Sequence, residues 1–264
     1  MTPLVFDIKR TSTADGPGIR TAVFFKGCSL DCLWCHNPES KSSHAELGLL
    51  AEKCIGCGVC HTVCEHTDSC IVCGKCAETC PADARKLYGL RYTADELYTI
   101  LSADRDYYDA TGGGVTFSGG ECMLYPDFIA SLASLCQDGG ISIAIDTAGN
   151  VPWSHFEKIL PFADCFLYDI KALDPKLHKA GTGADNRLIL SNLERLIAAG
   201  KQIIIRTPVI PAYNDGEELE KIKTYCCERN LPHELLPYHA FGESKKAALK
   251  AARNIQTPQK TNQS

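Results

Sequence analysis

The chain has 264 residues, and its 27 Lys and Arg against 32 Asp and Glu give a formal net charge of −5. That charge excludes a general attraction to nucleic acid or to an anionic membrane. The apolar stretches are too short to span a bilayer, and residues 1–10 lack the apolar core of a signal peptide. We therefore expect a cytoplasmic protein with one large domain, or one domain carrying a small insert.

Short apolar runs alternate with helical patterns along most of the chain. Strands are expected at 21–26, 115–118, 141–146, 165–170, 202–209 and 234–238, and helices at 93–103, 126–138, 153–160, 191–199 and 217–229. The first helix opens with a capping box from Thr93 to Glu96. Six β/α units predict an α/β fold, a partial TIM-type (β/α)6 barrel. A doubly wound open sheet is the structural alternative.

Cysteine distribution is the most informative feature of the composition. Eleven of the 16 cysteines lie between Cys28 and Cys80, and without an export signal such runs indicate metal ligation rather than disulfides. Three thiolates on one loop, Cys28, Cys32 and Cys35, can hold three irons of a [4Fe–4S] cluster and leave the fourth iron open to a small molecule. The alternative is a structural zinc site completed by His36 or by a distant residue.

Two further cysteine runs each match the spacing of bacterial ferredoxins for a [4Fe–4S] cluster. Their eight candidate ligands are Cys54, Cys57, Cys60, Cys64, Cys70, Cys73, Cys76 and Cys80. In the ferredoxin pattern, one cluster is ligated by Cys54, Cys57, Cys60 and Cys80. The other cluster is ligated by Cys64, Cys70, Cys73 and Cys76. The short spacing between Cys64 and Cys70, and Glu65 where ferredoxins usually have proline, leave that pairing open.

The cysteine runs also divide the chain into domains. A ferredoxin-like iron–sulfur insert is expected at 53–84, within a barrel formed by 1–52 and 85–249. The polar segment 250–264 is predicted to be a disordered tail. Outside the runs, Cys136, Cys165, Cys226 and Cys227 are predicted to be core thiols, whereas Cys122 is given no role.

Several motifs together resemble the glycyl-radical-enzyme activating enzymes of the radical S-adenosylmethionine (SAM) superfamily, in the larger type with a two-cluster insert. They are DGPGIR (15–20), CSLDCLWCHNPE (28–39), GGGVTFSGGE (112–121), DTAG (146–149), YDIK (168–171), RTPVIP (206–211) and LLPYH (235–239). The resemblance implies an anaerobic oxidoreductase in which the reduced first cluster cleaves SAM to a 5′-deoxyadenosyl radical. That radical then abstracts a hydrogen from a glycine of a partner glycyl radical enzyme.

The same resemblance implies a set of cofactor-binding residues. They are Trp34 and His36 beside the adenine, Gly119, Gly120 and Glu121 for the SAM amino group, and Asp169, Lys171, Arg206 and His239 for other polar groups. It further implies a monovalent-cation site at Asp146, Thr147 and Asp169, completed by the carbonyl of Leu167.

The expected cofactors are therefore SAM, three [4Fe–4S] clusters and the monovalent cation. The expected partners are a glycyl radical enzyme as substrate and flavodoxin or ferredoxin as electron donor, with no nucleic acid, no membrane and a monomeric chain. Two alternatives stand beside this prediction. One is another radical SAM enzyme acting on a small molecule or on RNA, and the other is a ferredoxin-type electron-transfer protein.

Overall fold

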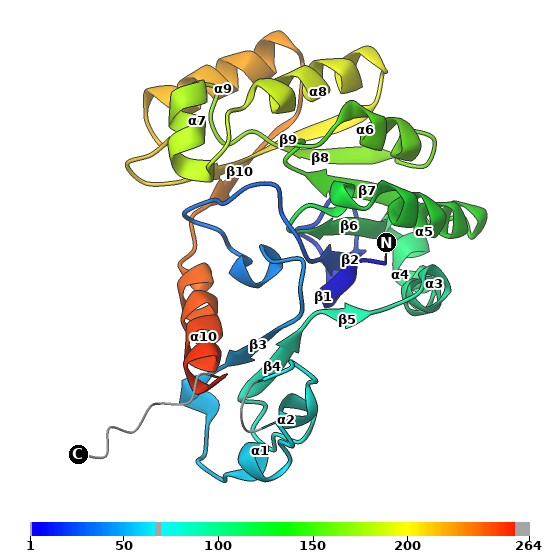
Figure 1. The fold of residues 1–264 in the computed structure, drawn as a ribbon. Coiled ribbons are helices and arrows are strands. Elements are labelled where there is room, and N and C mark those ends of the chain that lie inside the picture. The colour runs from blue at the N-terminus through cyan, green and yellow to red at the C-terminus, as the bar shows by residue number, and fades with distance from the viewer. Residues whose placement is uncertain (1, 67–69, 257–264) are drawn as a thin grey trace.

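The computed structural model describes residues 2–66 and 70–256. Its main body is an eight-stranded sheet in the order β10-β9-β8-β7-β6-β2-β1-β5 (Figure 1). Neighbouring parallel strands are β2 (Arg20–Phe25), β6 (Gly114–Gly119), β7 (Ser142–Thr147), β8 (Cys165–Asp169), β9 (Gln202–Val209) and β10 (His233–Pro237). These are the strands predicted from the sequence, and each end lies within one residue of its predicted position.

Two antiparallel strands extend the sheet beyond β2. Strand β1 (Leu4–Ser12) pairs with β2, and β5 (Leu90–Arg91) pairs with β1. The sequence did not predict β1 because exposed and buried residues alternate along part of it, which removes the continuous apolar run of a strand buried on both faces. The strand order begins at β10 and ends at β5, so the sheet is open. The predicted α/β fold with a partial barrel is confirmed.

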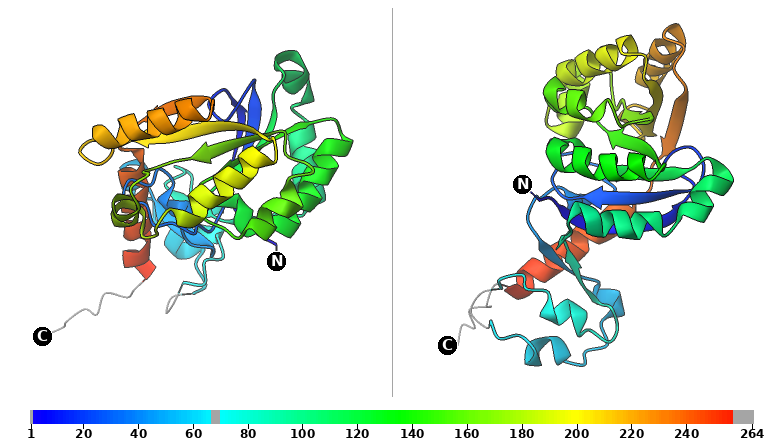
Figure 2. Two further views of the ribbon diagram at one scale, coloured as in Figure 1. Left: turned by 90° about the horizontal axis from the view of Figure 1, so that it is seen from above. Right: turned by 90° about the vertical axis from the view of Figure 1, so that its right-hand side faces the viewer.

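Helices cover the outer face of the sheet (Figures 1 and 2). They are α3 (Ala94–Ser102), α4 (Arg105–Thr111), α5 (Pro126–Asp138), α6 (Trp153–Ile159), α7 (Pro175–Thr182), α8 (Arg187–Ala198) and α9 (Glu217–Glu228). The capping box at Thr93 is confirmed. Two of the helices, α4 and α7, were not predicted.

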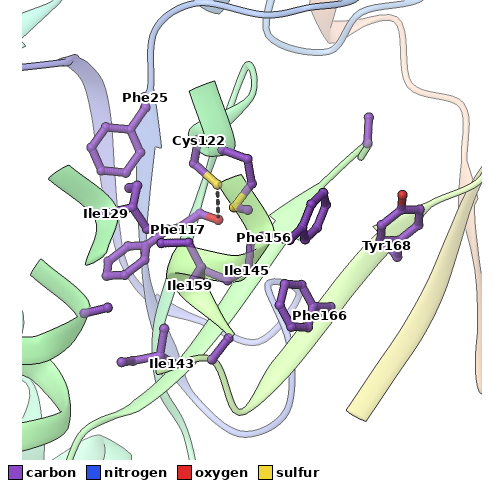
Figure 3. Packing of buried hydrophobic residues seen from close by; sticks show 14 of the residues in the cluster. Phe25, Phe117, Cys122, Ile129, Ile143, Ile145, Phe156, Ile159, Phe166 and Tyr168 are labelled. Atoms are coloured by element: carbon purple, nitrogen blue, oxygen red, sulfur yellow. Dashed lines mark hydrogen bonds between the residues drawn. The ribbon is translucent and has the colours of Figure 1, made fainter. Parts of the chain in front are cut away.

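The hydrophobic core lies between the sheet and these helices. Phe117, Ile145 and Phe166 come from three adjacent strands, and Ile129 and Phe156 come from α5 and α6 (Figure 3). All five are completely buried. Burial stabilises the fold by about 1.5–3 kcal/mol for each such side chain.

The remaining cysteines mostly belong to this core. Cys136, Cys165 and Cys226 are buried, whereas Cys227 is exposed, so its prediction as a core thiol was wrong. Cys227 follows Cys226 in α9, and one helical step turns its side chain away from the sheet.

Cys122 lies in the short 3-10 helix η3 (Cys122–Leu124). Its thiol donates a hydrogen bond to the Phe117 carbonyl at 3.3 Å (Figure 3). It therefore fills core space.

The cysteine-rich segment is carried on a two-stranded stem that projects from the main sheet (Figure 1). Strands β3 (Glu46–Leu49) and β4 (Arg85–Tyr88) pair antiparallel, and between them lie η2 (Ala51–Lys53), α1 (Val59–Thr62) and α2 (Lys75–Glu78). Gly58 and Gly74 precede the two short helices with left-handed φ values of +74° and +86°. Each helix carries the third cysteine of its run, so the two runs fold alike.

The last helix, α10 (Phe241–Gln256), follows β10 and lies beside β3 (Figure 1). The predicted tail at 250–264 is therefore helical as far as Gln256, and 257–264 lie outside the described residues. Ala248, Leu249 and Ala252 are all under 8% exposed and lie on one helical face, which explains why this polar-looking segment folds. Within the described residues, no helix is long and apolar enough to cross a membrane.

Candidate functional site

The polar residues predicted to form the site gather at the carboxyl ends of the parallel strands, the edge where α/β folds place ligands. They surround a cavity of about 610 Å³. Its lining includes every predicted residue of this site except Glu121 and Leu167, namely Cys28, Cys32, Trp34, Cys35, His36, Gly119, Gly120, Asp146, Thr147, Asp169, Lys171, Arg206 and His239. The structure therefore brings together motifs that are far apart in the sequence.

The first cysteine loop is held in place by its neighbours. The amides of Asp31 and Leu33 donate to the carbonyls of Thr182 and Gly181 at 2.8 and 3.0 Å, so the loop pairs with the end of α7. The ring of Trp34 lies 4.4 Å from that of Tyr213, measured between centroids. Gly181 is required here because a Cβ would lie 2.6 Å from the ring of Trp34.

The three thiols of this loop suit a group that ligates through sulfur. Burial raises the pKa of Cys28 to about 12 and also raises the pKa of Cys32 and Cys35, so without metal the sulfurs keep their protons. The Leu30 amide donates to the Cys28 sulfur at 3.5 Å.

Two charged pairs also line the cavity. Lys171 Nζ lies 2.6 Å from Asp169 Oδ2, and Arg206 Nη1 lies 3.4 Å from Asp146 Oδ1. Burial raises the pKa of Asp146, and the positive charge of Arg206 opposes that shift. Within the described part of the chain, Arg206 Nε and Nη1 are buried without a hydrogen-bond partner. Arg206 therefore pairs with Asp146 by charge through Nη1, and its buried Nε is left without a hydrogen bond.

Glu121 lies behind the cavity wall. Its carboxylate accepts hydrogen bonds from the hydroxyl of Thr147 and from the amides of Met123 and Ala148, at 2.7 to 3.2 Å. Burial raises its pKa to about 7. The side chain thus joins the loop after β6 to the loop after β7, while the backbone of Gly119 and Gly120 lines the cavity. A direct ligand contact by Glu121 stays a prediction.

Sequence reasoning missed several lining residues. They are Phe6, Asp7 and Lys9 of β1, Asp15 of the loop that follows, Tyr238 after β10, and Lys245 of α10. The DGPGIR motif, which begins at Asp15, was the one available signal for this wall. Nothing in the sequence indicated Lys245, because α10 was not predicted to fold back over the first cysteine loop.

The insert brings four of its eight cysteines around one small cavity. Cys64, Cys70, Cys73 and Cys76 line it together with Leu47 of the stem. This is one of the two sets given by the ferredoxin pairing. The positive charge of Arg85, at the start of β4, acts on both Cys60 and Cys76, one cysteine from each set.

Comparison with known proteins identifies the class. The sequence model of the radical SAM superfamily matches residues 22–225, more than half of the chain. The structure also resembles that of Streptococcus suis SuiB bound to precursor peptide SuiA, with a TM-score of 0.56 and 15% identity over 86% of this chain and 42% of that one. The structural comparison shows the fold alone. The match of the sequence model establishes that the chain belongs to the radical SAM superfamily.

Curated relatives narrow the class further. The chain is 41% identical over 263 residues to the trans-4-hydroxy-L-proline dehydratase activating enzyme of Clostridioides difficile, covering 93% of this chain and 87% of that protein. It is 39% identical over 230 residues to the (2S)-3-sulfopropanediol dehydratase activating enzyme of Klebsiella oxytoca, covering 80% and 73%. These relatives are glycyl-radical-enzyme activating enzymes, the group that the motifs resembled.

Proposed function

We propose that the chain activates a glycyl radical enzyme by generating a radical on a glycine of that partner protein. The observation that carries the proposal is that Cys28, Cys32 and Cys35 line the same cavity as the charged side chains at the strand ends. Similarity to activating enzymes over most of the chain supports it. The fold and the SAM-facing motifs favour this function over that of a ferredoxin-type carrier.

The residues present fit SAM and a [4Fe–4S] cluster. When bound and reduced, these groups supply the 5′-deoxyadenosyl radical that abstracts hydrogen from glycine. Cys28, Cys32 and Cys35 would hold three irons, which leaves the fourth iron for the amino and carboxylate groups of SAM. Trp34 and His36 would border the adenine, and the walls around them would exclude water.

The remaining cavity residues would orient the polar groups of SAM. Lys171 and Arg206 provide positive charge, while Asp146 and Asp169 provide negative charge close to them. We also place a monovalent cation at Asp146, Thr147 and Asp169, whose oxygens are hard ligands of the type such cations prefer. Gly119, Gly120 and His239 would complete the SAM site.

The function is tested with the reconstituted protein, SAM and a candidate partner. We expect 5′-deoxyadenosine to form together with a glycyl radical in the partner, detected by electron paramagnetic resonance (EPR). SAM cleavage without a partner radical, but with conversion of a small molecule, would favour the alternative of a different radical SAM enzyme.

Arg206→Met is expected to weaken SAM binding by about tenfold to a hundredfold, because charged hydrogen bonds contribute about 1.5–3 kcal/mol each. The buried donors Nε and Nη1 carry this expectation. Equilibrium dialysis of SAM measures the change. Arg195→Met is the matched control, since Arg195 stacks on Trp153 outside the cavity. An unchanged SAM affinity in Arg206→Met would remove Arg206 from the binding site.

We further propose that the insert holds two [4Fe–4S] clusters and relays electrons from flavodoxin or ferredoxin to the first cluster. Four cysteines around one small cavity support one of the two sites. Their clusters would be fully ligated by protein sulfur and therefore suited to electron transfer rather than to SAM binding. We propose that the chain works as a monomer.

Anaerobic reconstitution is expected to give about twelve irons per chain, because eleven cysteines lie in a three-plus-eight pattern that fits three four-iron clusters. Iron and sulfide analysis after gel filtration measures the content. Saturation at about four irons with tightly bound zinc would contradict the two-cluster insert.

A further inference from the structure

Four charged side chains lie between the first cysteine loop and the stem of the insert: Lys26, Glu39, Glu46 and Lys245. We call them the charge cluster. They come from four separate elements, since Lys26 follows β2, Glu39 lies in η1 (Pro38–Ser40), Glu46 begins β3 and Lys245 belongs to α10. The side chains of Lys26 and Glu39 are 0% and 3% exposed. Buried charges require paired and hydrogen-bonded positions, so these contacts have a defined geometry.

The two lysines hold the same segment of chain from opposite sides. Lys26 Nζ donates to the Glu39 carbonyl and to Glu46 Oε2, the latter at 3.1 Å. Lys245 Nζ donates to Asn37 Oδ1 and to Glu39 Oε1, both at 2.8 Å. The segment that directly follows Cys35 is thereby joined to β3 through one lysine and to α10 through the other.

Close backbone packing reinforces these contacts. A Cβ on Gly242, at the start of α10, would lie 2.1 Å from the Cys35 carbonyl oxygen, so the helix begins directly on the first cysteine loop. The rest of α10 lies along β3 (Figure 1). Gly89, just after β4, has φ +116°, and a Cβ there would lie 2.9 Å from Lys26 Cδ. The chain that enters β3 and the residue that follows β4 therefore both lie against the charge cluster.

The opposite side of the stem faces the insert. Leu47 is the neighbour of Glu46 in β3, and it lines the small cavity together with Cys64, Cys70, Cys73 and Cys76. Adjacent side chains of a strand point to opposite faces. One short strand thus contacts a cysteine site of the insert through Leu47, and through Glu46 it contacts Lys26, which in turn binds the segment after Cys35.

We propose that Lys26, Glu39, Glu46 and Lys245 are positioning residues that fix the insert relative to the first cluster, so that an electron can pass between them. This inference rests on the relay role proposed above. In this transfer, a reduced cluster held by the insert would give up one electron and the oxidised first cluster would accept it, with no bond or proton change. An external low-potential flavodoxin or ferredoxin reduces the insert again. Function at a buried site is sensitive to misplacement of about 1 Å by distant substitutions.

Glu46→Gln is the principal test, because it removes the one charge that the stem contributes to the charge cluster. Glu46 does not line the SAM cavity. With all three clusters loaded, electron transfer from the insert to the first cluster is expected to slow by about tenfold or more. Freeze-quench EPR follows the transfer. Amide hydrogen exchange in β3 and β4 is expected to accelerate. SAM cleavage driven by a small strong reductant that reaches the first cluster directly is expected to stay at the wild-type rate.

Glu52→Gln is the matched control, since Glu52 is exposed in η2 and its change removes the same charge from the insert. Its transfer rate is expected to equal that of the wild type. If Glu46→Gln fails to fold, Glu46→Asp keeps the charge, shortens the reach to Lys26 and is expected to slow transfer likewise. If Glu46→Gln holds about twelve irons per chain and transfers electrons at the wild-type rate, this inference alone is overturned. If the wild-type protein binds only about four irons per chain, the proposed relay is overturned as well.

Discussion

Cys32→Ala is expected to abolish SAM cleavage and to leave the clusters of the insert in place. Cys32 is one of three cysteines on its loop, and the cavity lining contains no further cysteine that would replace it. Loss of this thiolate therefore releases the first cluster. Iron content is expected to fall from about twelve to about eight per chain. Formation of 5′-deoxyadenosine, iron analysis and EPR of the reduced protein measure the three effects.

Cys227→Ala is the control for this experiment, because Cys227 is exposed on α9 and belongs to none of the cysteine runs. It is expected to keep both the iron content and the cleavage rate of the wild type. Full SAM cleavage by Cys32→Ala would show that the first cysteine loop is not the SAM-binding centre.

Gly120→Ala is expected to abolish SAM binding and to lower the free energy of unfolding by about 1–3 kcal/mol, the usual effect of forcing atoms into a packed region. A Cβ at Gly120 would lie 2.2 Å from the Gly27 carbonyl oxygen and 3.0 Å from that of Ser40. Both neighbours are backbone atoms, so the first cysteine loop itself must move. Thermal unfolding and SAM dialysis measure the two effects.

Gly216→Ala is the matched control for the substitution. Gly216 precedes α9 with a φ of −109°, and a Cβ at this position would meet no atom within 4 Å. The variant is expected to bind SAM as the wild type does. Wild-type SAM affinity in Gly120→Ala would mean that the loop after β6 does not determine the position of the first cysteine loop.

The strands of the barrel and most of the site were predictable because each depends on local sequence. A parallel strand buried on both faces is a continuous apolar run, and the strand-end motifs lie where such strands stop. Cys28, Asp146 and Arg206 therefore meet at one edge once the strands are identified. A cavity lies at that edge, while the ligand roles of these residues stay predictions.

Other features were not predictable because they depend on contacts between distant segments. The direction of the Glu121 side chain is determined by Thr147 and Ala148, which follow the next strand. The fold of α10 depends on β3, against which its apolar face packs. Lys245 reaches Glu39 across more than two hundred residues of sequence, a separation at which composition and periodicity carry no information.

The stem of the insert has a consequence for how the protein unfolds. The chain enters the cysteine-rich segment through β3 and leaves it through β4, which are paired neighbours. The described side chains of that segment bury few apolar groups, so its order would depend on bound metal. It would then form a cooperative unit of its own, distinct from the barrel. Oxygen that destroyed the clusters proposed for this segment would then melt this unit alone and leave the barrel folded, so the damage would be repairable by renewed cluster loading.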